Sequence, residues 1–229
     1  MLIGLLLSWL LFSPRWSLST GWSSAIVRGW SRQLCHIVGL QIRCYGDVAT
    51  TPTLFVANHI SWLDIFALLA TFPVIFVSKQ EVAKWPILGR LARQVGTLFI
   101  QRGQFQAATA TANEMIQALS NHRSVLFFPE GTSTEGMSVK RFHARLFQAA
   151  IQTGVPVQPI ALRYPQGNSL NQIIPYVGDD IFIQHVWRVL GEEIFTVELW
   201  FGSPIPTYHR ERRELAHYAR QQILTLLQQ

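Results

Sequence analysis

The sequence predicts an α/β fold with a mainly parallel central sheet flanked by helices, preceded by an amphipathic helical segment at the amino terminus. Short apolar runs of strand length alternate with stretches of helical periodicity, which is typical of βαβ units. The runs show almost no polar alternation, as expected of strands buried on both faces of a parallel sheet. A chain of 229 residues suits one domain and a short appendage.

The predicted elements follow one another along the chain. Strands are expected at residues 41–45, 53–57, 74–78, 97–101, 124–128, 157–162 and 196–201. Helices are expected at residues 63–70, 87–95, 105–121, 140–153, 180–190 and 209–228. Ligands of such sheets bind beyond the carboxyl ends of the strands, so the loops that follow the strands are expected to carry the functional residues.

The composition of the amino-terminal segment indicates that it associates with a membrane. We therefore divide the chain into a membrane-associated helical segment, residues 1–46, and an α/β domain, residues 47–229. Residues 1–12 form an apolar run shorter than the ~20 residues that a membrane-spanning helix needs, and residues 22–40 have apolar side chains at helical spacing. The segment holds four arginines, four tryptophans and no acidic residue, which suits a bilayer interface. A helix packed on the domain and a cleaved signal peptide are the alternatives. Spanning the bilayer and lying in one leaflet both stay open.

The composition narrows the classes of function. Only 14% of the residues are charged and 49% are hydrophobic, which excludes a disordered chain. The net charge of +6 indicates an anionic partner or an anionic membrane surface. No dense run of arginines and no nucleic-acid-binding motif is present, so nucleic acid is not an expected partner. Two cysteines are too few for a disulfide scaffold.

The first functional motif, Asn-His-x-x-x-x-Asp at residues 58–64, directly follows a predicted strand. His59 is placed to act as a general base, and Asp64 can orient its ring and stabilise the imidazolium. The two can meet only if His59 precedes the helix, because five residues within one helix leave side chains about 140° apart. Ser61 is expected to cap that helix. The structural alternatives are a capping role for Asp64 and a buried structural role for His59.

Three further blocks adjoin other predicted strands. Phe-Pro-Glu-Gly-Thr at residues 128–132 predicts an exposed turn whose backbone N–H groups hold an oxyanion or a phosphate, with Glu130 accepting from substrate hydroxyls or pairing with an arginine. The alternative is an ordinary strand-to-loop turn. The block at residues 96–102 ends on Arg102, which is either a solvated charge or an anion clamp beside the histidine. Val-Pro-Val-Gln-Pro at residues 155–159 predicts an edge or a wall of the sheet rather than a central strand.

These four blocks, in this order, resemble the glycerolipid and lysophospholipid acyltransferase family between residues 40 and 205. The resemblance implies O-acyl transfer from acyl-CoA or acyl-carrier protein to the free hydroxyl of a lysolipid in phospholipid biosynthesis, with 1-acylglycerol-3-phosphate as acceptor and phosphatidic acid as product. It implies that His59 is the base and Asp64 its partner. It also implies that the acceptor is bound by Asn58, Arg102, Glu130, Gly131 and Thr132.

Two departures from the family pattern concern the acceptor. Many members have an arginine directly after Phe-Pro-Glu-Gly-Thr and an aspartate before the arginine of the second block, where this chain has Ser133 and Gln101. Either Lys140 or Arg141 replaces the missing arginine, or the acceptor has no glycerol phosphate. The continuation Gly-Thr-Ser-Thr-Glu-Gly resembles the branch that includes lyso-ornithine lipid acyltransferases, so lyso-ornithine lipid or another lysophospholipid is the alternative acceptor.

The expected reaction needs no metal, no cofactor and no covalent nucleophile, because a thioester is already activated. The sequence contains none of the motifs Gly-x-Ser-x-Gly, His-Glu-x-x-His, Walker A and Gly-x-Gly-x-x-Gly. We therefore expect a one-step transfer with acyl-CoA or acyl-carrier protein as co-substrate, at the cytoplasmic face of the inner (plasma) membrane. A membrane-bound binding protein with a decayed site is the competing class.

Overall fold

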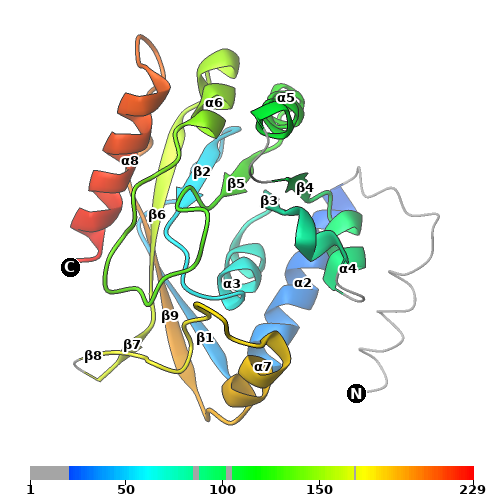
Figure 1. Cartoon of the computed structure of the whole chain (residues 1–229), viewed down its shortest axis with the longest axis vertical. Coiled ribbons are helices and arrows are strands. Elements are labelled where there is room, and N and C mark those ends of the chain that lie inside the picture. The colour runs from blue at the N-terminus through cyan, green and yellow to red at the C-terminus, as the bar shows by residue number, and fades with distance from the viewer. Residues whose placement is uncertain (1–20, 85–87, 102–104, 168) are drawn as a thin grey trace.

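The centre of the molecule is a seven-stranded sheet with the strand order β1-β9-β6-β2-β5-β3-β4 (Figure 1). The computed structural model describes residues 21–84, 88–101, 105–167 and 169–229. The strands of the sheet are β1 (Leu40–Tyr45), β2 (Leu54–Ala57), β3 (Ile75–Lys79), β4 (Leu98–Ile100), β5 (Val125–Phe127), β6 (Val157–Arg163) and β9 (Phe195–Phe201). Every neighbouring pair in this sheet is parallel except β6 with β9. The predicted α/β fold with a mainly parallel sheet is confirmed.

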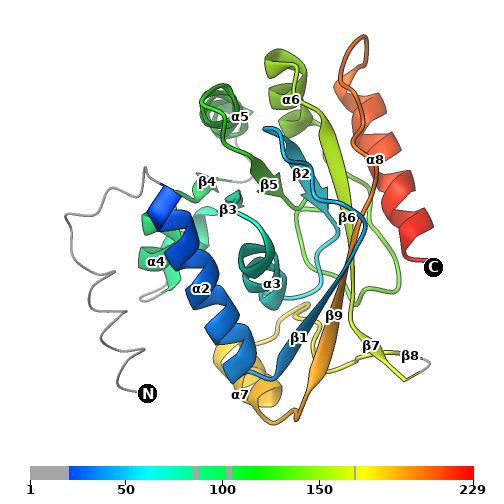
Figure 2. The ribbon, with the colours of Figure 1, turned by 180° about the vertical axis from the view of Figure 1, so that it is seen from behind.

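Helices cover both faces of this sheet. They are α2 (Gly21–Ile37), α3 (Leu63–Thr71), α4 (Leu88–Gln94), α5 (Phe105–Ser120), α6 (Gln148–Thr153), α7 (Phe182–Leu190) and α8 (Arg212–Leu226), with 3₁₀ turns at Gln80–Lys84 and Arg145–Phe147. Helices α2, α3 and α7 lie on one face, and α5, α6 and α8 lie on the other (Figures 1 and 2). Each face has its own core, the first built around Leu63 and Leu68 of α3, the second around Met115 of α5 and Leu215 of α8.

Two local elements differ from the prediction. The helix expected over residues 140–153 begins only at residue 148, after the 3₁₀ turn. Its first residues are instead held as a loop, because the N–H of His143 donates to the carbonyl of Pro129 at 2.8 Å. A small hairpin of β7 (Pro165–Gln166) and β8 (Ser169–Leu170) was not predicted.

The prediction that Val-Pro-Val-Gln-Pro marks an edge strand is wrong. Strand β6 lies between β9 and β2, with Pro159 opposite Val56 of β2. Regular pairing with β9 begins one residue later, at Ile160, and the carbonyl of Gly202, opposite Pro159, accepts the side-chain amide of Gln158 at 2.8 Å in place of a backbone N–H. The carbonyl of Pro159 still accepts the N–H of Gly202 at 2.9 Å. The side chain of Gln158 thus replaces the missing N–H of Pro159, and pairing with the chain after β9 continues between Val157 and Ile205.

The described part of the amino-terminal segment is integrated into the same sheet. Strand β1 pairs with β9 along its whole length, and α2 packs against α3. Beyond β1, the buried side chain of Gln158 donates to the carbonyl of Asp47 at 2.8 Å and accepts the N–H of Ala49 at 2.9 Å. The boundary expected at Gly46 thus does not coincide with a break in the sheet. The apolar run at residues 1–12 lies outside the described residues.

In the parts of the chain that the structure describes, no helix is long and apolar enough to cross a membrane.

Candidate active site

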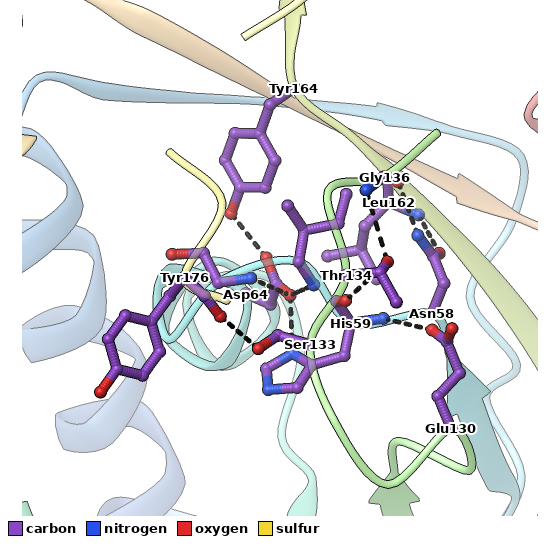
Figure 3. A network of polar contacts seen from close by, with 12 residues as sticks. Asn58, His59, Asp64, Glu130, Ser133, Thr134, Gly136, Leu162, Tyr164 and Tyr176 are labelled. Carbon is purple, nitrogen blue, oxygen red and sulfur yellow. Dashed lines mark hydrogen bonds and ion pairs between the residues drawn. The ribbon is translucent and has the colours of Figure 1, made fainter. Parts of the chain in front are cut away.

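The structure brings His59 and Asp64 together at the carboxyl end of β2. His59 lies in the loop after β2, and Asp64 lies in the first turn of α3. Nδ1 of His59 is 2.8 Å from Oδ2 of Asp64, and the side chains are 20% and 0% exposed, respectively. Figure 3 shows the other ring nitrogen, Nε2, pointing away from the carboxylate. A neutral ring that donates its Nδ1–H to Asp64 leaves Nε2 free to accept a proton.

Asp64 is held in one orientation by hydrogen bonds to both carboxylate oxygens (Figure 3). Besides the histidine ring, Oδ2 accepts the N–H groups of Ile60 at 2.7 Å and Ser61 at 3.0 Å. Oδ1 accepts the hydroxyl of Tyr164 at 2.7 Å. Burial, reinforced by the negative charge of Asp64, raises the pKa of Tyr164 well above its ordinary value, so this hydroxyl stays a donor. Hydrogen bonds to an ionised acceptor are the strong ones, so the carboxylate is rigid.

Only half of the expected capping box forms before α3. Asp64 accepts the N–H of Ser61, but α3 has no side-chain cap, and the buried Ser61 hydroxyl has no hydrogen-bond partner among the described residues. His59 does lie outside the helix, as expected, although the cause is the carboxylate of Asp64 and not the Ser61 hydroxyl. Asp64 therefore orients the histidine and also holds the chain that leads into α3, through the N–H groups of Ile60 and Ser61.

Phe128 fixes the plane of the histidine ring. The rings of His59 and Phe128 are stacked, with centroids 3.9 Å apart and an interplanar angle of 14°. The sequence assigned no role to Phe128, and its only signal was an aromatic residue directly before the Pro-Glu-Gly turn. The ring of His59 is thus held on one face by Phe128 and at Nδ1 by Asp64.

The Pro-Glu-Gly turn is buried, so the prediction of an exposed turn is wrong. Glu130 is only 4% exposed, and its two oxygens accept the N–H groups of His59 at 3.0 Å and Lys140 at 2.7 Å. Burial raises the pKa of Glu130, although these two N–H groups act in the opposite direction. The N–H of Gly131 closes the turn on the carbonyl of Phe128 at 3.0 Å, so it is not available to an oxyanion. Glu130 joins the histidine loop to the loop that carries Lys140.

The other residues predicted to bind the lysolipid acceptor do not share one environment. Asn58 is buried and pairs with the backbone of Leu162 in β6, donating at 3.0 Å and accepting at 2.7 Å. Thr132 is half-buried in the loop beyond the turn. Ser133 donates its hydroxyl to the carbonyl of Tyr176. Arg102, the cation predicted for the site, lies outside the described residues. Across the described ranges, no cluster of three or more His, Cys, Asp or Glu side chains could hold a metal ion.

A second histidine, His185 of α7, attaches that helix to the site. Trp62, which directly precedes α3, donates its Nε1–H to Nδ1 of His185 at 3.0 Å. Nε2 of His185 lies 3.1 Å from the carbonyls of Ile174 and Pro175. These partners assign the neutral ring with its proton on Nε2. Burial lowers the pKa of His185, which agrees with a neutral ring.

Replacing His185 by glutamine is expected to remove a pH-dependent part of the stability. In the unfolded chain the ring takes up a proton near its ordinary pKa of about 6.5, whereas in the folded state burial lowers this pKa. Between the two values the unfolded state binds more protons, so the free energy of unfolding falls as the pH falls. Urea unfolding should show wild type losing stability relative to His185→Gln between about pH 7 and about pH 5. A difference that is constant over this range would contradict the assignment.

An α/β fold with a carboxylate-oriented histidine at the carboxyl end of a central strand is the arrangement expected of an enzyme with a histidine base. Comparisons with known proteins identify the family. The model of the family described as Acyltransferase matches residues 41–163. The chain is 39% identical over 198 residues to the lyso-ornithine lipid O-acyltransferase of Pseudomonas aeruginosa, an alignment that covers 86% of this chain and 76% of that protein.

Two further comparisons agree. The chain is 33% identical over 164 residues to the 1-acyl-sn-glycerol-3-phosphate acyltransferase of Neisseria gonorrhoeae, covering 72% of this chain and 64% of that protein. The crystal structure of the 1-acyl-sn-glycerophosphate acyltransferase of Thermotoga maritima has the same fold, with a TM-score of 0.72, 21% identity, and coverage of 99% of this chain and 88% of that one. The chain therefore belongs to the acyltransferase family, and the enzyme class predicted from the four sequence blocks is confirmed.

Proposed function

We propose that the protein transfers a fatty acyl group from a thioester donor to the free hydroxyl of a lysolipid, with His59 as general base and Asp64 as its orienting partner. The observation that carries this proposal is the 2.8 Å contact between Nδ1 of His59 and buried Asp64, which leaves Nε2 facing away from the protein carboxylate. Asp64 plays the part that a buried aspartate plays beside a catalytic histidine in hydrolases, fixing the tautomer and stabilising the imidazolium.

The reaction takes place in one displacement at the thioester carbon. Nε2 of His59 removes the proton of the lysolipid hydroxyl while the hydroxyl oxygen attacks the thioester carbonyl carbon. This step forms a tetrahedral intermediate and an imidazolium, which Asp64 stabilises. The intermediate collapses with cleavage of the carbon–sulfur bond, and the imidazolium returns the proton to the leaving thiolate. The products are a new ester and a free thiol. Base assistance of this kind typically supplies about 10²–10⁴-fold in rate.

Lyso-ornithine lipid is the acceptor that we propose first. Ser133 stands where many family members carry an arginine, and its hydroxyl is bound to the carbonyl of Tyr176. An ornithine head group carries both an ammonium group and a carboxylate, so it needs less positive charge around it than a phosphate does. The lyso-ornithine lipid O-acyltransferase of Pseudomonas aeruginosa, at 39% identity, supports this choice.

The second candidate acceptor is 1-acylglycerol-3-phosphate, which the resemblance implies and which the name of the Neisseria relative supports. In either case the acceptor is a membrane lipid, so we propose that the protein acts at the membrane surface, where its lysolipid substrate lies.

A panel of acceptors tests the proposal. The purified protein is given a labelled acyl thioester with lyso-ornithine lipid, lysophosphatidate or lysophosphatidylethanolamine, and the ester products are separated and counted. We expect kcat/KM for lyso-ornithine lipid to exceed that for lysophosphatidate by about tenfold or more, a difference of about 1.4 kcal/mol. The reverse order would show that the acceptor is the glycerol phosphate. A protein that consumes none of the acceptors would contradict the proposed function itself.

A further inference from the structure

A pocket that the proposed chemistry does not use lies between helix α8 and the loop that precedes the 3₁₀ turn at Arg145–Phe147. Its volume is about 420 Å³, within the range of small-molecule sites. Two separate parts of the chain line it, and they contribute Arg141, Phe142, Ala144, Arg213, Ala216, His217 and Arg220. Three arginines thus line one hollow, and no Asp or Glu is among the lining residues.

The positive charge of this pocket is not neutralised within the described part of the chain. Arg141 and Arg213 are exposed and have no hydrogen-bond or ion-pair partner among the described residues. Arg220 donates hydrogen bonds from Nε and Nη2 to the carbonyls of Val139 and Lys140. These acceptors are neutral, so they leave the charge of Arg220 uncompensated. A hollow lined by charges of one sign concentrates the field and attracts ions of the opposite sign.

Folding of α8 does not account for these arginines. Arg212 and Arg213 open the helix, at the end where its dipole disfavours cations, and Glu214 of the same turn is paired with Arg210 instead. The burial of α8 is supplied by apolar side chains such as Leu215 and Ala219.

The pocket is separated from His59 by the sheet and the loop between them. Phe142 belongs to the core on the face of α5, α6 and α8, whereas Phe128, which stacks on His59, packs against the core on the opposite face. The two sites are nevertheless linked by one carboxylate, because Glu130 accepts the N–H of both His59 and Lys140. A lysolipid has its head group only a few bonds from the reacting hydroxyl. The phosphates of coenzyme A are held away from the thioester by the long pantetheine arm.

We propose that this pocket binds the phosphate groups of the nucleotide part of coenzyme A, and so seats the acyl donor with its thioester directed to His59. Arginine suits this ligand, since its planar fork binds phosphate with two hydrogen bonds and stacks on aromatic bases. The inference rests on the proposed function, because it takes the donor to be an acyl thioester. Arg141 and Arg213 are the residues expected to contact phosphate, and Arg220 holds the loop on α8.

Binding of desulfo-coenzyme A, which cannot react, tests the pocket directly. Calorimetry on the full-length protein in about 0.15 M salt compares wild type with Arg213→Glu, Arg141→Glu and the matched control Arg212→Glu. The control makes the same charge change one residue away, outside the pocket lining. We expect the Kd to rise about tenfold or more in the two pocket variants, and less than about twofold in the control, because phosphate contacts by arginine are charge-assisted.

Kinetics with two donors separate this inference from the proposed function. The KM for acyl-coenzyme A should rise in parallel with the Kd in the pocket variants, while turnover of an acyl-N-acetylcysteamine thioester, which has no phosphate, stays at the wild-type level in Arg213→Glu. Equal weakening in all three variants, no binding of desulfo-coenzyme A to wild type, or a defect confined to acyl-carrier protein as donor would each overturn the inference. If wild type transferred no acyl group at all, the proposed function would fail, and the binding measurement would still decide the pocket.

Discussion

Replacing His59 by alanine is expected to lower kcat by about 10²–10⁴-fold, the contribution of a positioned general base. The protein should stay folded, because Asp64 keeps its hydrogen bonds to Ile60, Ser61 and Tyr164 when the ring is removed. The measurement is initial-rate acyl transfer, with circular dichroism and the urea midpoint as checks on the fold.

His143→Ala is the matched control for this experiment. His143 lies in the loop that packs on the Pro-Glu-Gly turn, but its side chain is exposed, and its link to Pro129 is a backbone hydrogen bond that alanine retains. Its activity should stay close to wild type. Near-wild-type activity in His59→Ala itself would remove the histidine from the mechanism.

Replacing Asp64 by asparagine is expected to reduce both turnover and stability. The neutral amide no longer stabilises the imidazolium and does not fix the tautomer, so kcat should fall by about 10²-fold or more. The amide nitrogen cannot accept hydrogen bonds, so some of the buried donors that now bind Asp64 lose their partner. Each unpaired group lowers the free energy of unfolding by about 1–3 kcal/mol. Urea unfolding should therefore show a free energy of unfolding lower by about 2–5 kcal/mol.

Tyr164→Phe separates the two effects of Asp64. Phenylalanine removes only the hydrogen bond to Oδ1, which is worth about 1.5–3 kcal/mol of stability because the acceptor is charged and buried, and leaves the contact of Oδ2 with His59 in place. We expect a small decrease in kcat at unchanged KM. If Asp64→Asn lost stability but kept wild-type turnover, Asp64 would be a helix cap and nothing more.

The local parts of the site could be predicted because neighbouring residues determine them. The apolar strand, the Asn-His pair that follows it and Asp64 in the first turn of the helix lie within eleven consecutive positions, 54–64. The strands at the centre of the sheet were predictable for a similar reason, since strands buried on both faces are continuous apolar runs.

The parts that could not be predicted depend on contacts between distant residues. Tyr164 is 100 residues from Asp64 along the chain, and no local pattern links them. The turn at Glu130 resembled an exposed Pro-Gly turn, and it is buried because the loop of Lys140 folds over it. Pro159 resembled an edge residue, and it is tolerated in a central strand because the side chain of Gln158 donates to Gly202 in its place.

Direct acyl transfer to a lysolipid is tested most directly by following both products of one reaction. The purified wild-type protein is incubated with an acyl thioester and lyso-ornithine lipid, and the new ester, the free fatty acid and the released thiol are measured together by mass spectrometry. We predict one ester for each thiol released, with little free fatty acid, and loss of this product in His59→Ala. Thiol release that yields free fatty acid and no ester would contradict the account, because it would show that water, and not a lipid hydroxyl, is the acceptor.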